Sequence, residues 1–137
     1  MDPSTEAAAV PDEGVVFAQA LARKDPEALR AVLAPDVDFR GLTPRRFWEC
    51  GTPEEVVDVV FGNWFEPQEE ILALLDVATG EPVEDTRRVG YRLALRTPDG
   101  LFTVEQQAYY RTEGGRIAYL RVLCSGYRPA AEPAPAG

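Results

Sequence analysis

The chain contains no histidine. This absence excludes histidine as a general base, the Ser-His and Cys-His pairs of nucleophilic enzymes, and every metal site that includes an imidazole ligand. Cysteine is also scarce, because Cys50 and Cys124 are the only two in the sequence. Two thiols cannot form a four-thiolate site, and their spacing neither requires nor forbids a disulfide. We therefore expect reduced cysteines, no metal and no cofactor.

Positive charge and long apolar runs are lacking too. The sequence has 14 basic against 23 acidic residues and a net charge of −9, so the basic surface typical of nucleic-acid binding is missing. No stretch approaches the roughly 20 apolar residues of a membrane-spanning helix. Residues 1–13 are acidic and do not resemble a signal peptide. We expect a cytoplasmic protein with neither nucleic acid nor membrane as a partner.

The remaining composition is that of an ordinary globular domain. Of the 137 residues, 45% are hydrophobic and 27% are charged, which is enough apolar material for one core. Residues 1–12 and 129–137 contain almost nothing large enough to bury, so we predict disordered tails there. The folded domain is predicted over residues 13–128.

Three helices are predicted in the first half of the chain. The first begins after Asp12 and ends near Lys24, and the second begins after Asp25 and stops at Pro35. The third opens with Thr52-Pro53-Glu54-Glu55, a capping box with proline at the first helical position. Apolar residues recur at helical spacing after each of these starts.

Strands dominate the second half. Alternating or continuous apolar patterns predict strands at 37–40, 71–78, 87–96, 101–111 and 117–125. The turn Thr97-Pro98-Asp99-Gly100 joins two of them into a hairpin. Its four-residue loop places Leu93 opposite Val104 and Tyr91 opposite Gln106 on the face that we expect to be buried.

The next connection, around Gly114-Gly115, determines which face of the last strand is buried. A two-residue turn would bury Arg121, and an unpaired buried charge is costly. We therefore predict a three-residue loop. This loop pairs Gln106 with Val122 and Tyr110 with Ala118, and leaves Arg121 across from Gln107 on the outer face.

Helices followed by antiparallel strands indicate the α+β class. Three segments resemble the nuclear transport factor 2-like superfamily and its SnoaL-like domains: Phe17 to Phe39, the helix start Gly51-Thr-Pro-Glu-Glu-Val-Val, and Gly115-Arg-Ile-Ala-Tyr-Leu-Arg. The resemblance implies a cone-shaped fold, with three N-terminal helices packed on a curved, mostly antiparallel sheet. It also implies a pocket inside the cone and, commonly, a homodimer.

The catalytic residues of the relatives are not present at the matching positions of this chain. The tyrosine and the base aspartate of the ketosteroid isomerases fall on Phe17 and Gly41, and their protonated aspartate falls on Gln106. The aspartate and tyrosine of the limonene epoxide hydrolases fall on Val122 and Phe39, and the scytalone dehydratases need histidine. Whether this chain is an enzyme therefore stays open.

Four polar residues are the candidates for chemistry. Gln106 lies on the predicted buried face, where its amide must find a hydrogen bond. It either holds a ligand carbonyl or is satisfied by Tyr91 or the backbone. Tyr91 and Tyr110 flank it and either orient a substrate or pack as wall residues. Glu49, in the connection before the third helix, is the carboxylate that we expect to reach the cavity and the one candidate base.

The rest of the expected pocket is apolar. Trp48 stacks on a planar ligand or fills a gap in a loop, Cys124 acts as a small apolar residue, and Trp64 is assigned to the core. The predicted ligand-pocket residues are Phe17, Phe39, Trp48, Val60, Leu93, Val104, Ala108, Leu120, Val122 and Cys124.

Three functions remain at this point, of which one is a transport-factor-like adaptor that binds a different protein through its outer sheet face. The first is a SnoaL-like protein that binds a small, largely apolar or polycyclic metabolite, with cyclisation, isomerisation or dehydration of a polyketide-like or terpenoid substrate if it is an enzyme. The alternative is a non-catalytic binding or interaction module with a self-filled cavity. Tyr109, Tyr119 and Leu123, set among arginines on the outer sheet face, predict a homodimer there.

Overall fold

Three α-helices occupy the first half of the chain in the computed structural model, which describes residues 12–130. They are α2 (Glu13–Ala22), α3 (Pro26–Val32) and α4 (Pro53–Val59), and α4 continues into a π-helical turn, η1 (Val60–Trp64). The predicted caps are confirmed. The side chains of Asp12, Asp25 and Thr52 accept hydrogen bonds from backbone N–H groups in the first turns of α2, α3 and α4.

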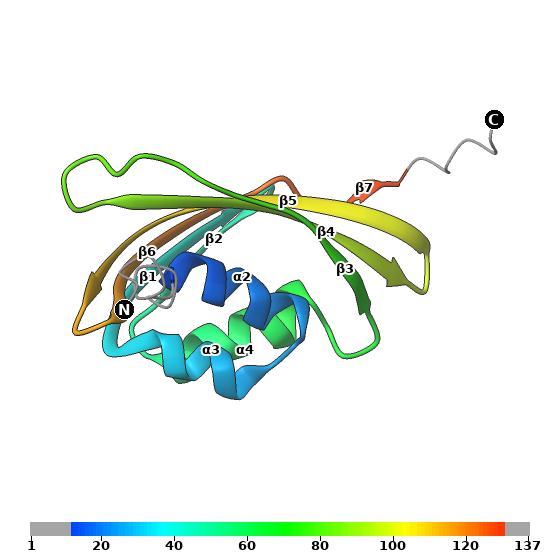
Figure 1. Cartoon of the computed structure of the whole chain (residues 1–137). Coiled ribbons are helices and arrows are strands. Elements are labelled where there is room, and N and C mark those ends of the chain that lie inside the picture. Colours follow the sequence, from blue (N-terminus) through cyan, green and yellow to red (C-terminus); the bar gives the residue numbers. More distant parts are fainter. Residues whose placement is uncertain (1–11, 131–137) are drawn as a thin grey trace, which may run out of the picture.

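The strands form a single seven-stranded sheet with the order β2-β1-β6-β5-β4-β3, and β7 pairs with β5. β1 and β6 run parallel, while the other neighbours are antiparallel. The strands are β1 (Leu33–Thr43), β2 (Arg46–Cys50), β3 (Glu70–Thr79), β4 (Arg87–Thr97), β5 (Gly100–Glu113), β6 (Arg116–Cys124) and β7 (Arg128–Pro129). Figure 1 shows the helices gathered beneath one face of this curved sheet.

The first strand and its connection differ from the prediction. β1 is 11 residues long rather than four, and the segment predicted as a long connection contains β2, which forms a hairpin with β1 through the pair Thr43 and Arg46. The side chains of β2 alternate, with Trp48 and Cys50 turned inward and Phe47 and Glu49 outward. β2 is an edge strand, and its sequence, Arg46-Phe-Trp-Glu-Cys50, does not alternate between polar and apolar residues, so no strand pattern is visible in it.

The β4–β5 hairpin has the predicted register. Tyr91 lies opposite Gln106, and Leu93 lies opposite Val104. All four of these side chains are buried. Alternation along both strands therefore sends one face into the core and the other outward.

The β5–β6 register is a correction. The turn has two residues, Gly114-Gly115, rather than three, and Gln106 pairs with Cys124 while Tyr110 pairs with Leu120. Arg121 still lies on the outer face, opposite Tyr109 rather than Gln107. The reason is a bulge, because the pairing passes from Arg111–Tyr119 directly to Thr112–Ile117 and skips Ala118. The extra residue reverses the alternation of the strand and cancels the effect of the shorter turn.

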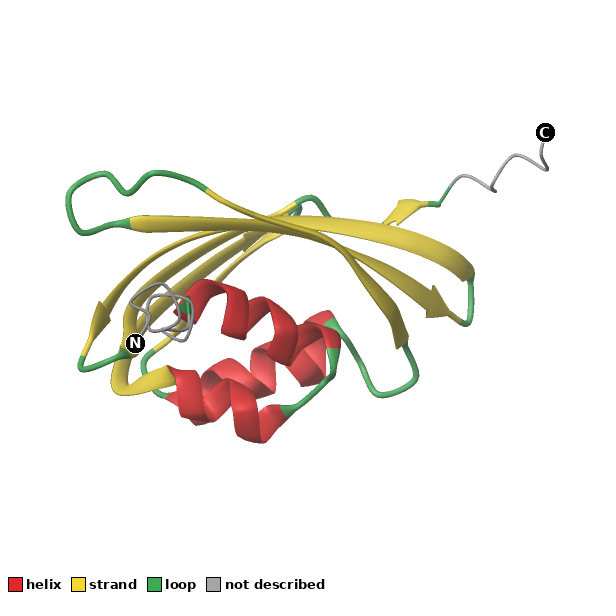
Figure 2. Ribbon diagram, viewed as in Figure 1, coloured by secondary structure: helices red, strands yellow, loops and turns green. Residues whose placement is uncertain are grey.

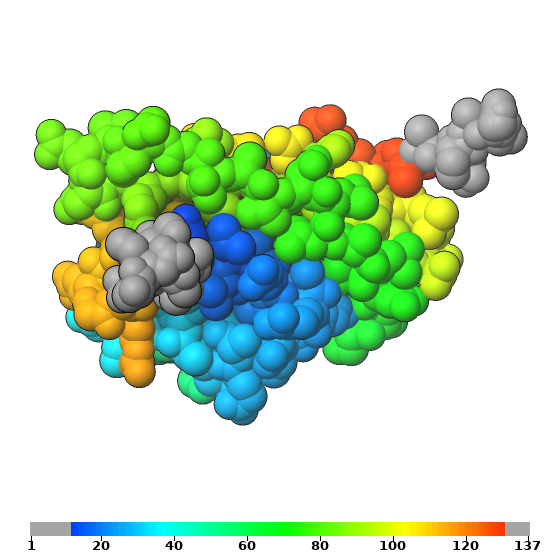
Figure 3. Space-filling model, viewed as in Figure 1, coloured from blue at the N-terminus to red at the C-terminus, as the bar shows by residue number. Residues whose placement is uncertain are grey.

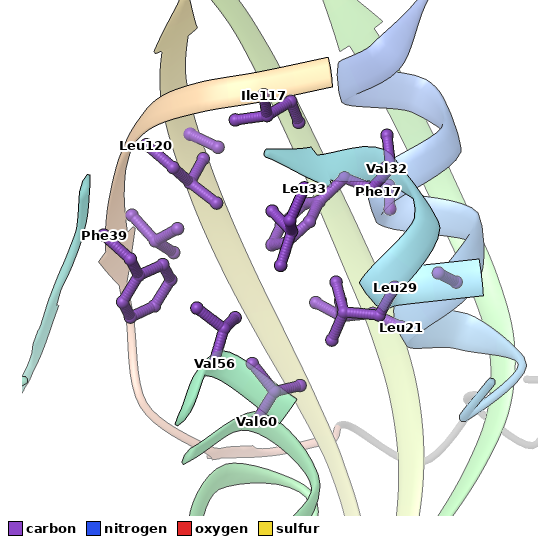
Figure 4. Close-up of a cluster of buried hydrophobic side chains, with 14 of the residues drawn as sticks. Phe17, Leu21, Leu29, Val32, Leu33, Phe39, Val56, Val60, Ile117 and Leu120 are labelled. Carbon is purple, nitrogen blue, oxygen red and sulfur yellow. The ribbon is translucent and has the colours of Figure 1, made fainter. Parts of the chain in front are cut away.

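The core lies between the helices and the concave face of the sheet. Figure 2 shows the two layers, and in the space-filling view α2 lies directly beneath β3, with α3 below α2 (Figure 3). Figure 4 shows side chains from α2, α3, α4, η1, β1 and β6 converging in this space. The labelled members are fully buried or nearly so: Phe17, Leu21, Leu29, Val32, Leu33, Phe39, Val56, Val60, Ile117 and Leu120.

The C-terminal end of the domain remains attached to the sheet beyond the expected boundary at residue 128. Arg128 and Pro129 pair with β5, and the Ala130 N–H donates to the Leu101 carbonyl at 3.0 Å. The rest of the predicted tails, residues 1–11 and 131–137, lies outside the described residues. Among the helices that the structure describes, none has the length and apolar character needed to cross a membrane.

Candidate functional site

A cavity of about 190 Å³ lies beside the β1–β2 hairpin, between η1, the ends of β1 and β6, and the segment that follows β6. Four of its nine lining residues are aromatic, and two others carry amide side chains. The lining residues are Thr43, Trp48, Asn63, Trp64, Phe65, Gln106, Cys124, Gly126 and Tyr127.

Two tryptophans form adjoining walls of the cavity. The Trp48 and Trp64 rings lie 6.4 Å apart between centroids and are nearly perpendicular, at 80°. Trp64 packs beside Gly41 of β1, where a Cβ atom would lie 2.8 Å from Trp64 Cζ2. Glycine at position 41 therefore makes room for the indole ring, which was assigned to the core and is found to line the cavity as well.

Gln106 reaches the cavity from the middle of β5 and is 1% exposed. Its Oε1 accepts a 2.6 Å hydrogen bond from the Tyr91 hydroxyl. Burial raises the pKa of Tyr91 well above its usual value, so this residue is a neutral phenol and a donor. Because Tyr91 holds the amide oxygen, Gln106 Nε2 is left as the free end, and this buried nitrogen has no hydrogen-bond partner among the described residues.

Trp64 contributes a second free donor. Its side chain is 8% exposed, and the buried Nε1 has no hydrogen-bond partner within residues 12–130. Trp64 ends the π-helical turn, a rare conformation that is often found at functional sites. By contrast, Trp48 Nε1 donates to Thr43 Oγ1 at 2.9 Å.

Several other polar groups of the lining are already in hydrogen bonds. The Thr43 hydroxyl donates to the Arg46 carbonyl, at 3.2 Å. Cys124 Sγ accepts the Gly126 N–H at 3.4 Å. Asn63 is exposed at the rim, and its Nδ2 donates to the Asp58 carbonyl.

Tyr127 closes the cavity from the C-terminal side. Its hydroxyl lies 2.6 Å from both the Trp64 carbonyl oxygen and Glu69 Oε1. Burial and the hydrogen bond to Glu69 raise the pKa of Tyr127. The loop between η1 and β3 is also bound by Lys24, whose Nζ donates to the backbone carbonyls of Glu66 and Glu69. Sequence patterns missed Tyr127, since it follows the last predicted strand and belongs to no periodic segment.

Three of the four predicted catalytic residues do not line the cavity. Tyr91 lies behind Gln106, and Tyr110 packs against Gly14 while its hydroxyl donates to Asp12. Glu49 points outward from β2, with its side chain 61% exposed and 3.5 Å from the Arg40 guanidinium. The strict alternation of a strand explains this placement, because Trp48 faces inward and its neighbour must face out.

Of the predicted pocket residues, Trp48 and Cys124 line the cavity. The others are buried in the core, where they fill the space between sheet and helices rather than bordering a hollow. These are Phe17, Phe39, Val60, Leu93, Val104, Ala108, Leu120 and Val122. The cavity is therefore confined to one end of the core.

The chemical character of the site follows from its lining. The lining includes Gln106 and Trp64, each with a buried N–H that has no partner among the described residues, and no carboxylate or guanidinium side chain is among the described lining residues. Nor do residues 12–130 bring together three or more cysteine, aspartate or glutamate side chains in a group suited to a metal ion. The arrangement can bind and polarise a small molecule, but it places no carboxylate base against it.

Comparison with known proteins identifies the fold. The sequence matches no family model and no curated protein. Among solved structures, a nuclear transport factor 2-like protein from Burkholderia thailandensis superimposes with a TM-score of 0.63 at 16% identity, over 82% of this chain and 88% of its own. A candidate polyketide cyclase from Xanthomonas campestris gives 0.62 at 16% identity, over 81% and 86%.

A third neighbour is a protein with a ketosteroid isomerase-like fold from Catenulispora acidiphila, solved in complex with trimethylamine. Its TM-score is 0.67 at 15% identity, over 85% of this chain and 87% of its own. The chain thus has the nuclear transport factor 2-like fold that its sequence resembles. Identities this low show the fold alone.

Proposed function

We propose that this protein binds a small, largely apolar molecule in the cavity that Gln106 and Trp64 line. The observation that carries the proposal is the Gln106 amide, which is buried beside the cavity and whose nitrogen has no partner within residues 12–130. A buried donor without a partner costs about 1–3 kcal/mol, and a ligand that accepts from it recovers that cost. Fold neighbours that handle small molecules support the same reading.

The size of the cavity limits the ligand. Its volume of about 190 Å³ is below the roughly 300–1,000 Å³ of pockets that enclose drug-sized ligands. A compound of one ring fits this volume better than the polycyclic metabolites that the sequence suggested. Trimethylamine, which the Catenulispora acidiphila neighbour binds, is also small.

If the protein turns its ligand over, the reaction is an isomerisation, cyclisation or dehydration that needs orientation and polarisation more than an ionised base. Gln106 then polarises the substrate, and Tyr91 is a positioning residue that fixes the amide. Glu49 faces away and has no part in this proposal. A purely binding role is the alternative, and it is favoured by the absence of a carboxylate among the described lining residues.

Native mass spectrometry of the protein purified from its own host tests the binding function. We expect a co-purifying small molecule, and we expect Gln106→Leu to lose it while keeping a native circular dichroism spectrum. Gln107→Leu is the matched control, because Gln107 is the next residue on β5 and contacts Arg88 on the outer face. Equal occupancy in both variants would show that the molecule binds elsewhere.

We also propose that the protein is a cytoplasmic homodimer built on the outer face of the sheet. Both cysteines are free thiols, which fits a reducing compartment. The outer face exposes Leu42, Phe47 and Leu123, and Tyr119 is held between two guanidinium groups, Arg111 at 3.8 Å and Arg121 at 4.0 Å. Aromatic and arginine side chains around an apolar centre are typical of interfaces.

A further inference from the structure

A second hollow lies on the helical layer, outside the cavity described above. It is a groove of about 310 Å³ between the start of α3, α4, η1 and the loop that follows η1. Phe65 lines this groove and also lines the cavity of about 190 Å³, and no other described residue is common to the two linings. The two hollows therefore adjoin at Phe65. The groove residues are Lys24, Pro26, Arg30, Val57, Phe61, Phe65 and Pro67.

The Phe65 side chain fills the space where the two hollows adjoin. It is only 1% exposed, although the residue borders both. Its ring stacks on the ring of Tyr127, at 6.3 Å between centroids and 19° between planes. Tyr127 lines the cavity and is not among the described residues of the groove. Phe65 is thus a buried wall, with an aromatic residue of the cavity packed against it.

The chain is held in place on both sides of Phe65. The Trp64 carbonyl accepts a 2.6 Å hydrogen bond from the Tyr127 hydroxyl. The Glu66 carbonyl accepts a 2.7 Å hydrogen bond from Lys24 Nζ. Phe65 donates its own N–H into the π-helical turn, at 2.8 Å. Because three consecutive residues are hydrogen-bonded and the ring is stacked, the wall cannot move aside without breaking several contacts.

We propose that Phe65 sets the size limit of the ligand by separating the cavity from the groove. This inference rests on the proposed binding function. With the ring in place, the ligand is confined to the cavity, which suits one ring. Truncation of a buried ring leaves a hollow that its surroundings fill only in part. The joined space would fall within the roughly 300–1,000 Å³ of pockets that enclose drug-sized ligands. Phe61 and Val57 would give its added part apolar walls.

Phenol and 4-phenylphenol are the probe pair, since they share a hydroxyl group and differ by one ring. Both tryptophans of the chain line the cavity, so their indole ¹H–¹⁵N signals report binding there. In the wild-type protein we expect phenol to shift these signals saturably and 4-phenylphenol to bind about tenfold more weakly or worse. In Phe65→Ala we expect 4-phenylphenol to bind about tenfold more tightly than in the wild type, with phenol little changed. The backbone amide signal of Phe61 should then shift too, because the second ring reaches the groove.

Phe61→Ala is the matched control, since it removes a ring that lines the groove but not the cavity. It should leave both affinities unchanged. Phe65→Leu loses less volume, so it replaces Phe65→Ala if that variant lacks a native circular dichroism spectrum, and it should give a smaller gain for 4-phenylphenol.

Two results would overturn the size limit while phenol binding upholds the binding function. One is equal affinity of the wild-type protein for the two probes. The other is a folded Phe65 variant that binds 4-phenylphenol no better than the wild type does. Failure of both probes to shift the indole signals in the wild type and in the variants would overturn both proposals.

Discussion

At the scale of single residues, the electrostatics of this protein are dominated by burial of groups that stay neutral. Tyr91, Tyr110 and Tyr127 have pKa values raised chiefly by burial. Burial, followed by the negative charges of Glu55 and Asp58, raises the pKa of Cys50 from its usual 9.0 to about 11. In each case the folded protein holds a proton that the unfolded chain releases more readily, so alkaline conditions oppose folding.

We predict that the free energy of unfolding falls as the pH rises from about 9 to about 11. Over this window the unfolded chain loses the Cys50 proton and the native protein keeps it, so the slope of stability against pH is negative. Urea unfolding at a series of pH values measures this slope. Cys50→Ala should have a shallower slope, with the tyrosines supplying the remainder. An identical slope in wild type and variant would contradict the raised pKa of the thiol.

At the scale of elements, the β5–β6 hairpin shows how a turn and a bulge act together. Gly114 and Gly115 have φ values of +59° and +81°, the positive values that both central residues of a type I′ turn require. The turn by itself would reverse the inward and outward faces of β6. Ala118 restores them for the residues beyond it by bulging out of the pairing, which buries Leu120 and leaves Arg121 outside.

We predict that Gly115→Ala destabilises the protein by about 1–2 kcal/mol, the cost of a Cβ atom in the left-handed region. The effect comes from the backbone alone, since a Cβ there would meet open space. Gly115→Asn is the control, because asparagine tolerates positive φ and should lose less. Urea midpoints of the two variants measure the difference, and an unchanged midpoint in Gly115→Ala would argue against the type I′ turn.

At the scale of the whole molecule, the two faces of the sheet differ in what covers them. The concave face is covered by helices and ends in the cavity, while the outer face carries exposed Leu42, Phe47 and Leu123 with no covering element among the described residues. Apolar groups exposed together on a sheet face are typical of an association surface.

We predict that Leu123→Glu converts the dimer to a monomer, because it places a charge at the centre of the proposed interface. Light scattering coupled to size-exclusion chromatography at micromolar concentration measures the mass. Val83→Glu is the matched control, since Val83 is also exposed but lies between β3 and β4, away from this patch. A wild-type protein that is monomeric, or a Leu123→Glu variant that remains dimeric, would refute the interface.

Features that depend on neighbouring residues in the chain were predictable without coordinates. Side-chain caps at Asp12, Asp25 and Thr52, the β4–β5 register and the pairing of Tyr91 with Gln106 are confirmed, because each arises from residues a few positions apart or joined by a short turn. The likeness to the nuclear transport factor 2-like fold is confirmed as well. This likeness was inferred from the order of the local patterns along the chain.

The position of the cavity and the residues that line it depend on contacts between segments that are distant in the sequence. Trp64, Tyr127 and Gly41 meet there from segments far apart in the chain, and no local pattern records such a contact. Glu49 was expected in the cavity and lies outside it, because pairing with β1 orients β2. The same holds for the β5–β6 bulge, whose place is set by the burial of a whole strand rather than by any residue within it. Close packing fills most of the core, so the remaining free volume lies where segments that are distant in the sequence do not pack tightly against one another.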